Sequence, residues 1–139
     1  MKVLLINGSP RRHGNTFQAL ETVARALQES GVEAEICQLG GKDVRGCQNC
    51  GGCSRRKDRR CVLTDGMNDI LEKIWAADGL VIGSPTYFSN VSSEVKALID
   101  RAGVVSGAND GLLRGKVGAA VVAARRAGAN FAFAAINFL

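Results

Sequence analysis

Short apolar runs alternate with amphipathic segments along the chain. Residues 3–6, 80–82 and 116–124 are mostly apolar and of strand length, which is typical of strands buried in a parallel sheet. Residues 33–39 alternate between polar and apolar positions, which indicates a strand on the outside of the sheet. The pattern therefore predicts four strands.

The segments between these strands have apolar residues at helical spacing. Apolar side chains recur at helical spacing in three segments, at Phe17, Leu20, Val23, Ala24 and Leu27, at Met67, Ile70, Leu71, Ile74 and Trp75, and at Val95, Leu98 and Ile99. The predicted boundary residues are Gly31 after the first helix, Thr64 or Asp65 before the second, and Ser92 or Ser93 before the third. A fourth helix is expected from Asn130 onward. This order predicts an α/β fold, a doubly wound parallel sheet between two layers of helices, as one domain over residues 1–139.

The composition is that of a folded protein without a membrane segment. Hydrophobic residues make up 46% of the 139, yet no apolar run reaches the roughly 18 residues that a membrane crossing needs. The apolar run at the N-terminus is too short for a signal peptide. We therefore expect a cytoplasmic protein, in which thiols stay reduced.

Residues 7–16 join the first strand to the first helix and suit a phosphate group. The start of a helix attracts an anion, and several groups here can donate to one: backbone N–H groups, the hydroxyls of Ser9 and Thr16, the amide of Asn15 and the guanidinium of Arg11 or Arg12. The loop matches neither the dinucleotide nor the nucleoside triphosphate fingerprint. The alternative is an ordinary turn in which Asn15 caps the helix, and His13 is interpreted as a solvated residue.

Residues 84–91 follow the third predicted strand and mix aromatic, hydroxyl and amide side chains. Such a mixture suits a planar heterocycle, which needs a flat surface and a few directional hydrogen bonds. The alternative places Tyr87 and Phe88 in the core. Ligands of doubly wound sheets bind at the carboxyl ends of the strands. Residues 7–16, 84–91 and 124–130 are all expected at that edge.

Four of the five cysteines follow the pattern C-x2-C-x2-C-x7-C, at Cys47, Cys50, Cys53 and Cys61. Zinc sites more often use two separated C-x2-C pairs, whereas iron–sulfur proteins use compact runs of this kind. Neighbouring glycines allow the backbone to turn closely around a cluster. The spacing therefore favours an iron–sulfur cluster, with zinc, reactive thiols or disulfides as alternatives. Cys37 is interpreted as a small buried residue.

Several short motifs carry a resemblance over almost the whole chain. They are I-N-G-S-P-R at residues 6–11, G-N-T at 14–16, the four cysteines, A-D-G at 77–79, G-S-P-T-Y-F at 83–88, K-A-L-I-D-R at 96–101, L-R-G-K at 113–116 and A-R-R-A-G at 124–128. Together they resemble the iron–sulfur flavoproteins, a branch of the NADPH-dependent FMN reductase superfamily with a flavodoxin-like fold. Chains of that family generally continue through a fifth strand and a last helix, so the resemblance implies a chain truncated at its C-terminus.

The resemblance implies two cofactors, FMN and a 4Fe–4S cluster. The implied FMN-binding residues are Ser9, Pro10, Arg11, Arg12, Asn15 and Thr16 in the first loop, Ser84, Pro85, Thr86, Tyr87, Phe88 and Asn90 in the second, and Ala124, Arg125, Arg126 and Gly128 in the third. The four clustered cysteines would hold the 4Fe–4S cluster, within a segment, residues 40–63, inserted after the second strand. No catalytic acid or base is expected.

The implied function is electron transfer. A ferredoxin-like donor or NAD(P)H would supply electrons, the cluster and FMN would carry them to a two-electron acceptor, and the chain would form a homo-oligomer, a dimer or tetramer. One alternative is an NAD(P)H-dependent FMN or quinone reductase whose cysteines bind structural zinc.

The positive charge of the chain admits a further alternative, a redox-sensing protein that binds nucleic acid. The formal net charge is +5, and residues 55–60, R-R-K-D-R-R, form a basic run. Two anionic cofactors would offset this excess, and the run has no interleaved aromatic side chains for stacking on bases. Nucleic acid is therefore an unlikely partner, and an acidic electron-transfer protein suits the basic run equally well.

Overall fold

Strands and helices alternate along the chain. The computed structural model describes residues 1–139. The elements are β1 (Lys2–Asn7), α1 (Asn15–Glu29), β2 (Glu33–Gln38), α2 (Gly52–Arg56), α3 (Met67–Ala76), β3 (Gly79–Pro85), α4 (Ser93–Ala108), β4 (Val117–Ala123) and α5 (Ala129–Asn137). The four strands form one parallel sheet in the order β2-β1-β3-β4. The predicted strands are confirmed, and β2 lies at an edge as its alternating sequence indicated.

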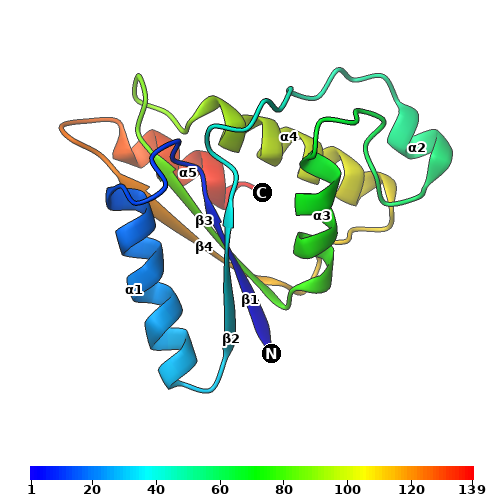
Figure 1. The fold of residues 1–139 in the computed structure, drawn as a ribbon. Helices are drawn as coiled ribbons and strands as arrows, with labels where there is room; N and C mark the ends of the chain where they lie inside the picture. Colours follow the sequence, from blue (N-terminus) through cyan, green and yellow to red (C-terminus); the bar gives the residue numbers. More distant parts are fainter.

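The sheet lies between two layers of helices (Figure 1). α1 packs on one face, where its Leu20 and Ala24 meet Val3, Leu5 and Val81 of the sheet. α3, α4 and α5 cover the opposite face. Because consecutive residues of a strand point to opposite faces, a strand that is apolar throughout, such as β1, serves both layers. The predicted doubly wound α/β fold is confirmed.

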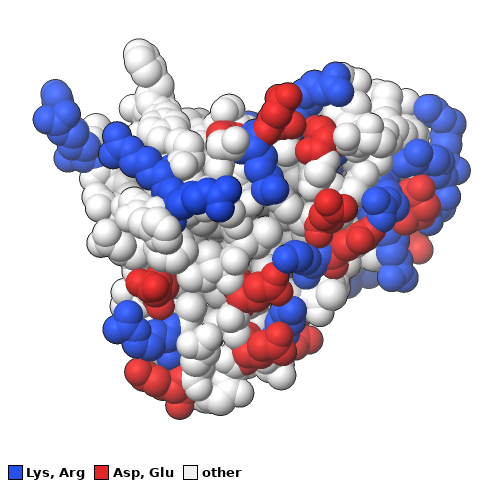
Figure 2. Space-filling view, in the orientation of Figure 1, with Lys and Arg blue, Asp and Glu red and all other residues white.

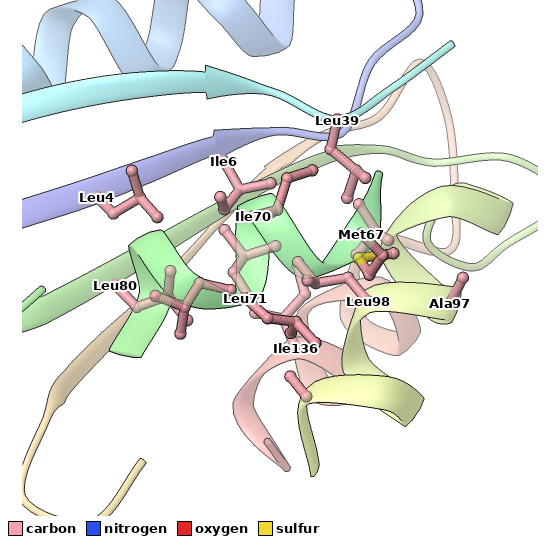
Figure 3. Packing of buried hydrophobic residues seen from close by; sticks show 14 of the residues in the cluster. Leu4, Ile6, Leu39, Met67, Ile70, Leu71, Leu80, Ala97, Leu98 and Ile136 are labelled. Atoms are coloured by element: carbon pink, nitrogen blue, oxygen red, sulfur yellow. The ribbon is translucent and has the colours of Figure 1, made fainter. Parts of the chain in front are cut away.

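The larger core fills the space under α3, α4 and α5. Figure 3 shows apolar side chains from both central strands and all three helices meeting there, among them Leu4, Ile6, Leu80, Ile70, Leu71, Leu98 and Ile136. Each such side chain, removed fully from water, contributes about 1.5–3 kcal/mol relative to exposure. This core holds the carboxyl ends of β1 and β3 in place beneath the loops that follow them.

In two helices, a side chain that precedes the first turn accepts a hydrogen bond from a free backbone amide of that turn. Ser92 Oγ accepts from the Val95 amide at 3.4 Å, which confirms Ser92 as the cap of α4. Asp65 Oδ1 accepts from the Met67 amide at 3.3 Å. The residue next to α3 is Gly66, in the left-handed conformation, so Asp65 acts from one residue further out than predicted.

The segment between β2 and α3 contains a short helix that the sequence pattern did not predict. α2 has five residues, and it is flanked by Gly51 and Lys57, both in the left-handed conformation. A helix of this length shows too few apolar positions to reveal a helical period. The four clustered cysteines lie on α2 and on the extended chain around it.

β4 forms the second edge of the sheet, beside α5. Val117 at the start of β4 is exposed, as are Phe131, Phe133 and Phe138 in and after α5. This side of the molecule therefore presents apolar side chains to its surroundings. None of the helices combines the length and apolar character that a membrane crossing requires.

Candidate functional site

Three loops meet at the carboxyl edge of the sheet and enclose a pocket of about 640 Å³. β1, β3 and β4 are adjacent and parallel, so the loops that follow them emerge side by side. We call this space the three-loop pocket. It is lined by Ser9, Arg11, Gly14, Asn15, Thr16, Pro85, Thr86, Tyr87, Val122, Ala123, Ala124 and Arg125. The prediction that the three loops come together is thus met by the geometry.

The first loop turns tightly at the start of α1. The Asn7 side chain is fully buried, and its Oδ1 accepts from the Ser9 amide at 3.2 Å. Ser9 Oγ accepts from the Arg11 amide at 3.2 Å. Gly14 precedes α1, no side chain caps that helix, and its first turn has no acidic residue. The free amides and the dipole of α1 are therefore available to an anion in the pocket.

Gln38, at the end of β2, holds this loop from outside. Its Nε2 donates to the Ser9 carbonyl and the Gly40 carbonyl, both at 2.7 Å, and its Oε1 accepts from Asn7 Nδ2 at 2.7 Å. Gly40 lies so close to the loop that a Cβ there would stand 2.6 Å from the Gly8 carbonyl carbon and closer still to the Ser9 carbonyl group. Sequence reasoning missed both residues, because they are distant in sequence and belong to no phosphate-binding motif.

The second loop contributes a lining residue, Thr86, whose hydroxyl has no hydrogen-bond partner in the protein. Thr86 Oγ1 is buried and has no hydrogen-bond partner, although buried hydroxyls are nearly always paired. Tyr87, beside it, is about half exposed. A ligand with an oxygen or nitrogen acceptor and a flat surface would satisfy both side chains.

Other residues of the second loop build it without lining the pocket. Ser84 is fully buried; its Oγ accepts from the Ser92 amide at 3.0 Å and donates to the Pro85 carbonyl at 2.8 Å. Asn90 pairs with Tyr87 through both backbone amides. Phe88, in the left-handed conformation, is fully exposed. The alternative that placed Tyr87 and Phe88 in the core is wrong.

Nine of the sixteen residues expected around FMN line the three-loop pocket, namely Ser9, Arg11, Asn15, Thr16, Pro85, Thr86, Tyr87, Ala124 and Arg125. The residues that do not line it are Pro10, Arg12, Ser84, Phe88, Asn90, Arg126 and Gly128. The added lining residues are Gly14, Val122 and Ala123. Val122 and Ala123 lie at the end of β4. The sequence could have indicated them as lining residues, because they directly precede the third loop.

Positive charge gathers around this pocket. Figure 2 shows Lys and Arg side chains over the loop before α1 and the loop after β4, and a second gathering over α2. Arg11 and Arg125 line the pocket from two different loops. Arg12 lines a neighbouring hollow with Lys42 and Lys73 instead. The field at the pocket mouth therefore favours an anionic ligand.

A second, smaller cavity of about 80 Å³ is lined by all four clustered cysteines, Cys47, Cys50, Cys53 and Cys61. We call it the cysteine cavity. All four are free thiols; Cys53 is buried and Cys50 is exposed. Nowhere in the chain do three or more His, Cys, Asp or Glu side chains converge closely enough to hold one metal ion. The four thiols thus share a cavity without meeting at a point.

The donor set and the backbone of the cysteine cavity fit a thiolate-bound cluster. Four thiols are the ligand set that 4Fe–4S clusters use. A Cβ at Gly52 would collide with Val62 Cγ1 and stand 3.6 Å from Cys50 Sγ, so a glycine is needed for the close turn. Cys37 lies outside the cavity on β2, where burial raises the pKa of its thiol. It is half-buried against the core rather than fully buried as predicted, and it lies apart from the other four cysteines as expected.

An ion pair fastens both ends of the cysteine segment to α4. Arg101 Nη1 donates to Asp65 Oδ2 at 2.7 Å and to the Arg45 carbonyl at 3.1 Å, and Nη2 donates to the Leu63 carbonyl at 3.4 Å. Asp65 Oδ2 accepts from the Arg45 amide at 2.9 Å. We call this arrangement the Asp65–Arg101 clasp. Arg45 precedes the four cysteines and Leu63 follows them, so one ion pair closes the loop that contains all four.

The clasp changes the acidity of Asp65. Burial raises the pKa of this carboxyl, but hydrogen bonds from Arg101 and from the Arg45 and Met67 amides outweigh burial, so the pKa lies below its ordinary value of 3.8. Asp65 is therefore ionised at neutral pH, and the ion pair is intact. Sequence reasoning assigned Asp65 only as a cap and gave Arg101 no individual role.

Comparison with known proteins agrees with this architecture. The family model described as NADPH-dependent FMN reductase matches residues 1–139. An iron–sulfur flavoprotein of Archaeoglobus fulgidus is 41% identical over 134 residues, which are 95% of this chain and 64% of that protein. Another, from Methanocaldococcus jannaschii, is 40% identical over 121 residues, 87% of this chain and 61% of that protein. The chain thus spans somewhat over three fifths of the length of these relatives.

Solved structures share the fold at lower sequence identity. The crystal structure of RosB with a bound 8-demethyl-8-formylriboflavin-5'-phosphate intermediate has a TM-score of 0.73 at 22% identity, covering 99% of this chain and 57% of that one. The NAD(P)H:quinone oxidoreductase of Methanothermobacter marburgensis has a TM-score of 0.64 at 20% identity, covering 89% and 66%. The chain therefore belongs to the NADPH-dependent FMN reductase family, and its predicted resemblance to the iron–sulfur flavoproteins is confirmed.

Proposed function

We propose that the chain binds FMN in the three-loop pocket and a 4Fe–4S cluster in the cysteine cavity, and that it works as an FMN-dependent electron-transfer oxidoreductase. One observation carries the proposal. Three loops far apart in sequence line one pocket that combines an uncapped helix start, two arginines and the unpartnered hydroxyl of Thr86. These are the features that a phosphate joined to a planar ring requires.

In this proposal the first loop binds the FMN phosphate. Ser9, Asn15 and Thr16 donate hydrogen bonds, with the free amides at the start of α1, and Arg11 adds a charge-assisted bond. Gln38 and Asn7 hold the loop in this conformation.

The other two loops bind the ring. Thr86 Oγ1 donates to a ring acceptor, Tyr87 covers part of its surface, and Arg125 places positive charge beside it. FMN, when bound, exchanges one or two electrons. Arg125 favours the reduced, anionic form of the ring. The pocket contains no pair of side chains suited to acid–base catalysis, and none is needed for electron transfer.

The four clustered cysteines hold the cluster in this proposal. When bound, a 4Fe–4S cluster supplies single electrons. Residues 55–60 form a basic surface over and after α2, which suits a small acidic electron donor such as a ferredoxin. NAD(P)H is the other proposed reductant. A homo-oligomer, in which exposed apolar side chains of β4 and α5 are covered, completes the proposal.

The second candidate is an NAD(P)H-dependent FMN or quinone reductase whose cysteines bind zinc. It is favoured by the shared fold of the NAD(P)H:quinone oxidoreductase from M. marburgensis, and zinc also accepts four thiolates. A comparison of reductants separates the two functions. The chain, reconstituted anaerobically with FMN, iron and sulfide, is mixed with reduced ferredoxin or with NADPH, and bleaching of the flavin absorbance is followed. Faster reduction by ferredoxin supports the leading proposal; reduction by NADPH alone, at the same rate without iron, supports the second.

A further inference from the structure

Arg101 lines the cysteine cavity and carries a buried donor that has no partner. Its side chain is fully buried, and its Nη1 and Nη2 atoms donate within the Asp65–Arg101 clasp. Its third nitrogen, Nε, is buried without any hydrogen-bond partner. A buried donor left unpaired costs about 1–3 kcal/mol, so this N–H calls for an acceptor that the protein does not provide.

The clasp prevents Arg101 from turning to satisfy Nε elsewhere. The planar guanidinium is fixed by Asp65 and by two backbone carbonyls on opposite ends of the cysteine segment. Arg101 also lines the cysteine cavity, and it is the only charged residue among the thirteen that do so. The other α4 residues that line the cavity, Val104 and Val105, are apolar. The unpaired donor and the only cationic group of the cavity therefore belong to the same side chain.

We propose that Arg101 donates its Nε–H to a sulfur atom of the cluster that the four cysteines hold, and that it thereby raises the reduction potential of that cluster. This inference rests on the proposed 4Fe–4S site. Sulfur bound to iron carries negative charge and accepts hydrogen bonds, and such bonds are among the factors that set the potential. One-electron reduction makes the cluster more negative, so the hydrogen bond and the charge both stabilise the reduced form. Arg101 is a positioning residue in this account, and the cysteines remain the ligands.

The role requires arginine. A lysine ammonium also carries positive charge, but its one nitrogen would already be bound to Asp65, whereas arginine keeps a separate Nε–H beside the two nitrogens that bind the clasp.

The test compares Arg101→Lys with the wild-type chain after anaerobic reconstitution with iron and sulfide. The midpoint potential is measured by redox titration followed by electron paramagnetic resonance. Arg101→Lys keeps the charge and an ion pair with Asp65 but removes Nε–H. We expect the equilibrium constant for reduction to fall about tenfold, which is about 59 mV for one electron. In D2O, the Fe–S stretching bands of the wild-type cluster shift in resonance Raman spectra, and the part of this shift due to Nε–H is lost in Arg101→Lys.

Two further variants make the result specific. Arg25→Lys, exposed on α1 at the opposite face of the sheet, is the matched control and leaves the potential unchanged. The double variant Arg101→Gln with Asp65→Asn removes both charges together, so that neither is left buried alone; it too lowers the potential. Circular dichroism of the metal-free chains checks that each variant folds. Wild-type potential and wild-type bands in both Arg101 variants, at full iron content, would overturn the role of Arg101 alone. A wild-type chain that takes up no iron would overturn the cluster proposal, and this inference with it.

Discussion

Gly40 tests whether the backbone of the first loop is positioned for phosphate. The Gly40 carbonyl and the Ser9 carbonyl share the Gln38 amide, so the two chain segments are held together. Gly40→Ala adds one methyl group, whose carbon would stand 2.6 Å from the Gly8 carbonyl carbon. The obstacle is backbone, which cannot rotate away as a side chain can.

The expected magnitude follows from this distance. An ordinary Cβ contact begins at 3.4 Å, so the Gly8 carbonyl carbon must move by about 0.8 Å, and the Ser9 carbonyl group, which lies closer, must move further. A forced shift of this kind costs about 1–3 kcal/mol. Displaced by that amount, the Ser9 hydroxyl and the amides before α1 no longer converge on one point. We expect the Kd for FMN to rise about 10- to 100-fold, since each factor of ten is about 1.4 kcal/mol.

The assay is quenching of flavin fluorescence on titration of the chain into FMN. The matched control is Gly46→Ala, because a Cβ at Gly46 has nothing within 4 Å. Gly46→Ala is expected to bind FMN as the wild type does. If Gly40→Ala folds and binds FMN with wild-type affinity, the first loop does not position the phosphate in the way described.

Three other substitutions probe separate contacts. Thr86→Val removes a hydroxyl that has no partner in the protein, so the flavin-free chain should melt at the same or a higher temperature while the Kd for FMN rises about 2- to 10-fold; an unchanged Kd would exclude a hydrogen bond to the ligand. Gln38→Leu leaves the Ser9 and Gly40 carbonyls unsatisfied and should destabilise the chain by about 1–3 kcal/mol in urea denaturation, whereas Gln28→Leu, on the exposed end of α1, should not. Asp65→Asn tests pH dependence. The folded-state pKa of Asp65 is depressed, so its contribution is present above the unfolded value near 3.8 and is lost as the pH falls below it. The difference in melting temperature between wild type and Asp65→Asn should therefore shrink below about pH 4, and a difference that stays constant from pH 7 to 3 would contradict the ion pair.

The sequence predicted best those parts of the structure that a local pattern of apolar residues determines. The apolar runs of β1 and β3 and the stripe of α3 predicted their elements, because burial on a sheet or a helix imposes a period. The same holds for the three loops. Once the strands are parallel and adjacent, the loops after them must share one edge, so their meeting in one pocket follows from strand order.

The remaining features depend on contacts between residues distant in sequence. Gln38 and Ser9 are 29 positions apart, and Arg101 and Asp65 are 36 apart. Neither pair leaves a periodic or motif signal, because a single amide or guanidinium finds its partners only after the sheet and α4 are packed. Within predicted loops, the backbone decides which side chains face the pocket. Thus Thr86 lines it, whereas Phe88 points into solvent.

A cofactor count per chain decides whether one chain holds FMN and a 4Fe–4S cluster at two separate sites. The chain is produced and purified without oxygen, incubated with FMN, iron and sulfide, and freed of unbound material. FMN, iron, sulfide and zinc are then measured per chain, with the visible and electron paramagnetic resonance spectra. We expect about one FMN, about four iron atoms and about four sulfides per chain, with the spectra of a flavin and a 4Fe–4S cluster together. Zinc without iron, or a folded chain that retains no flavin, would contradict this expectation.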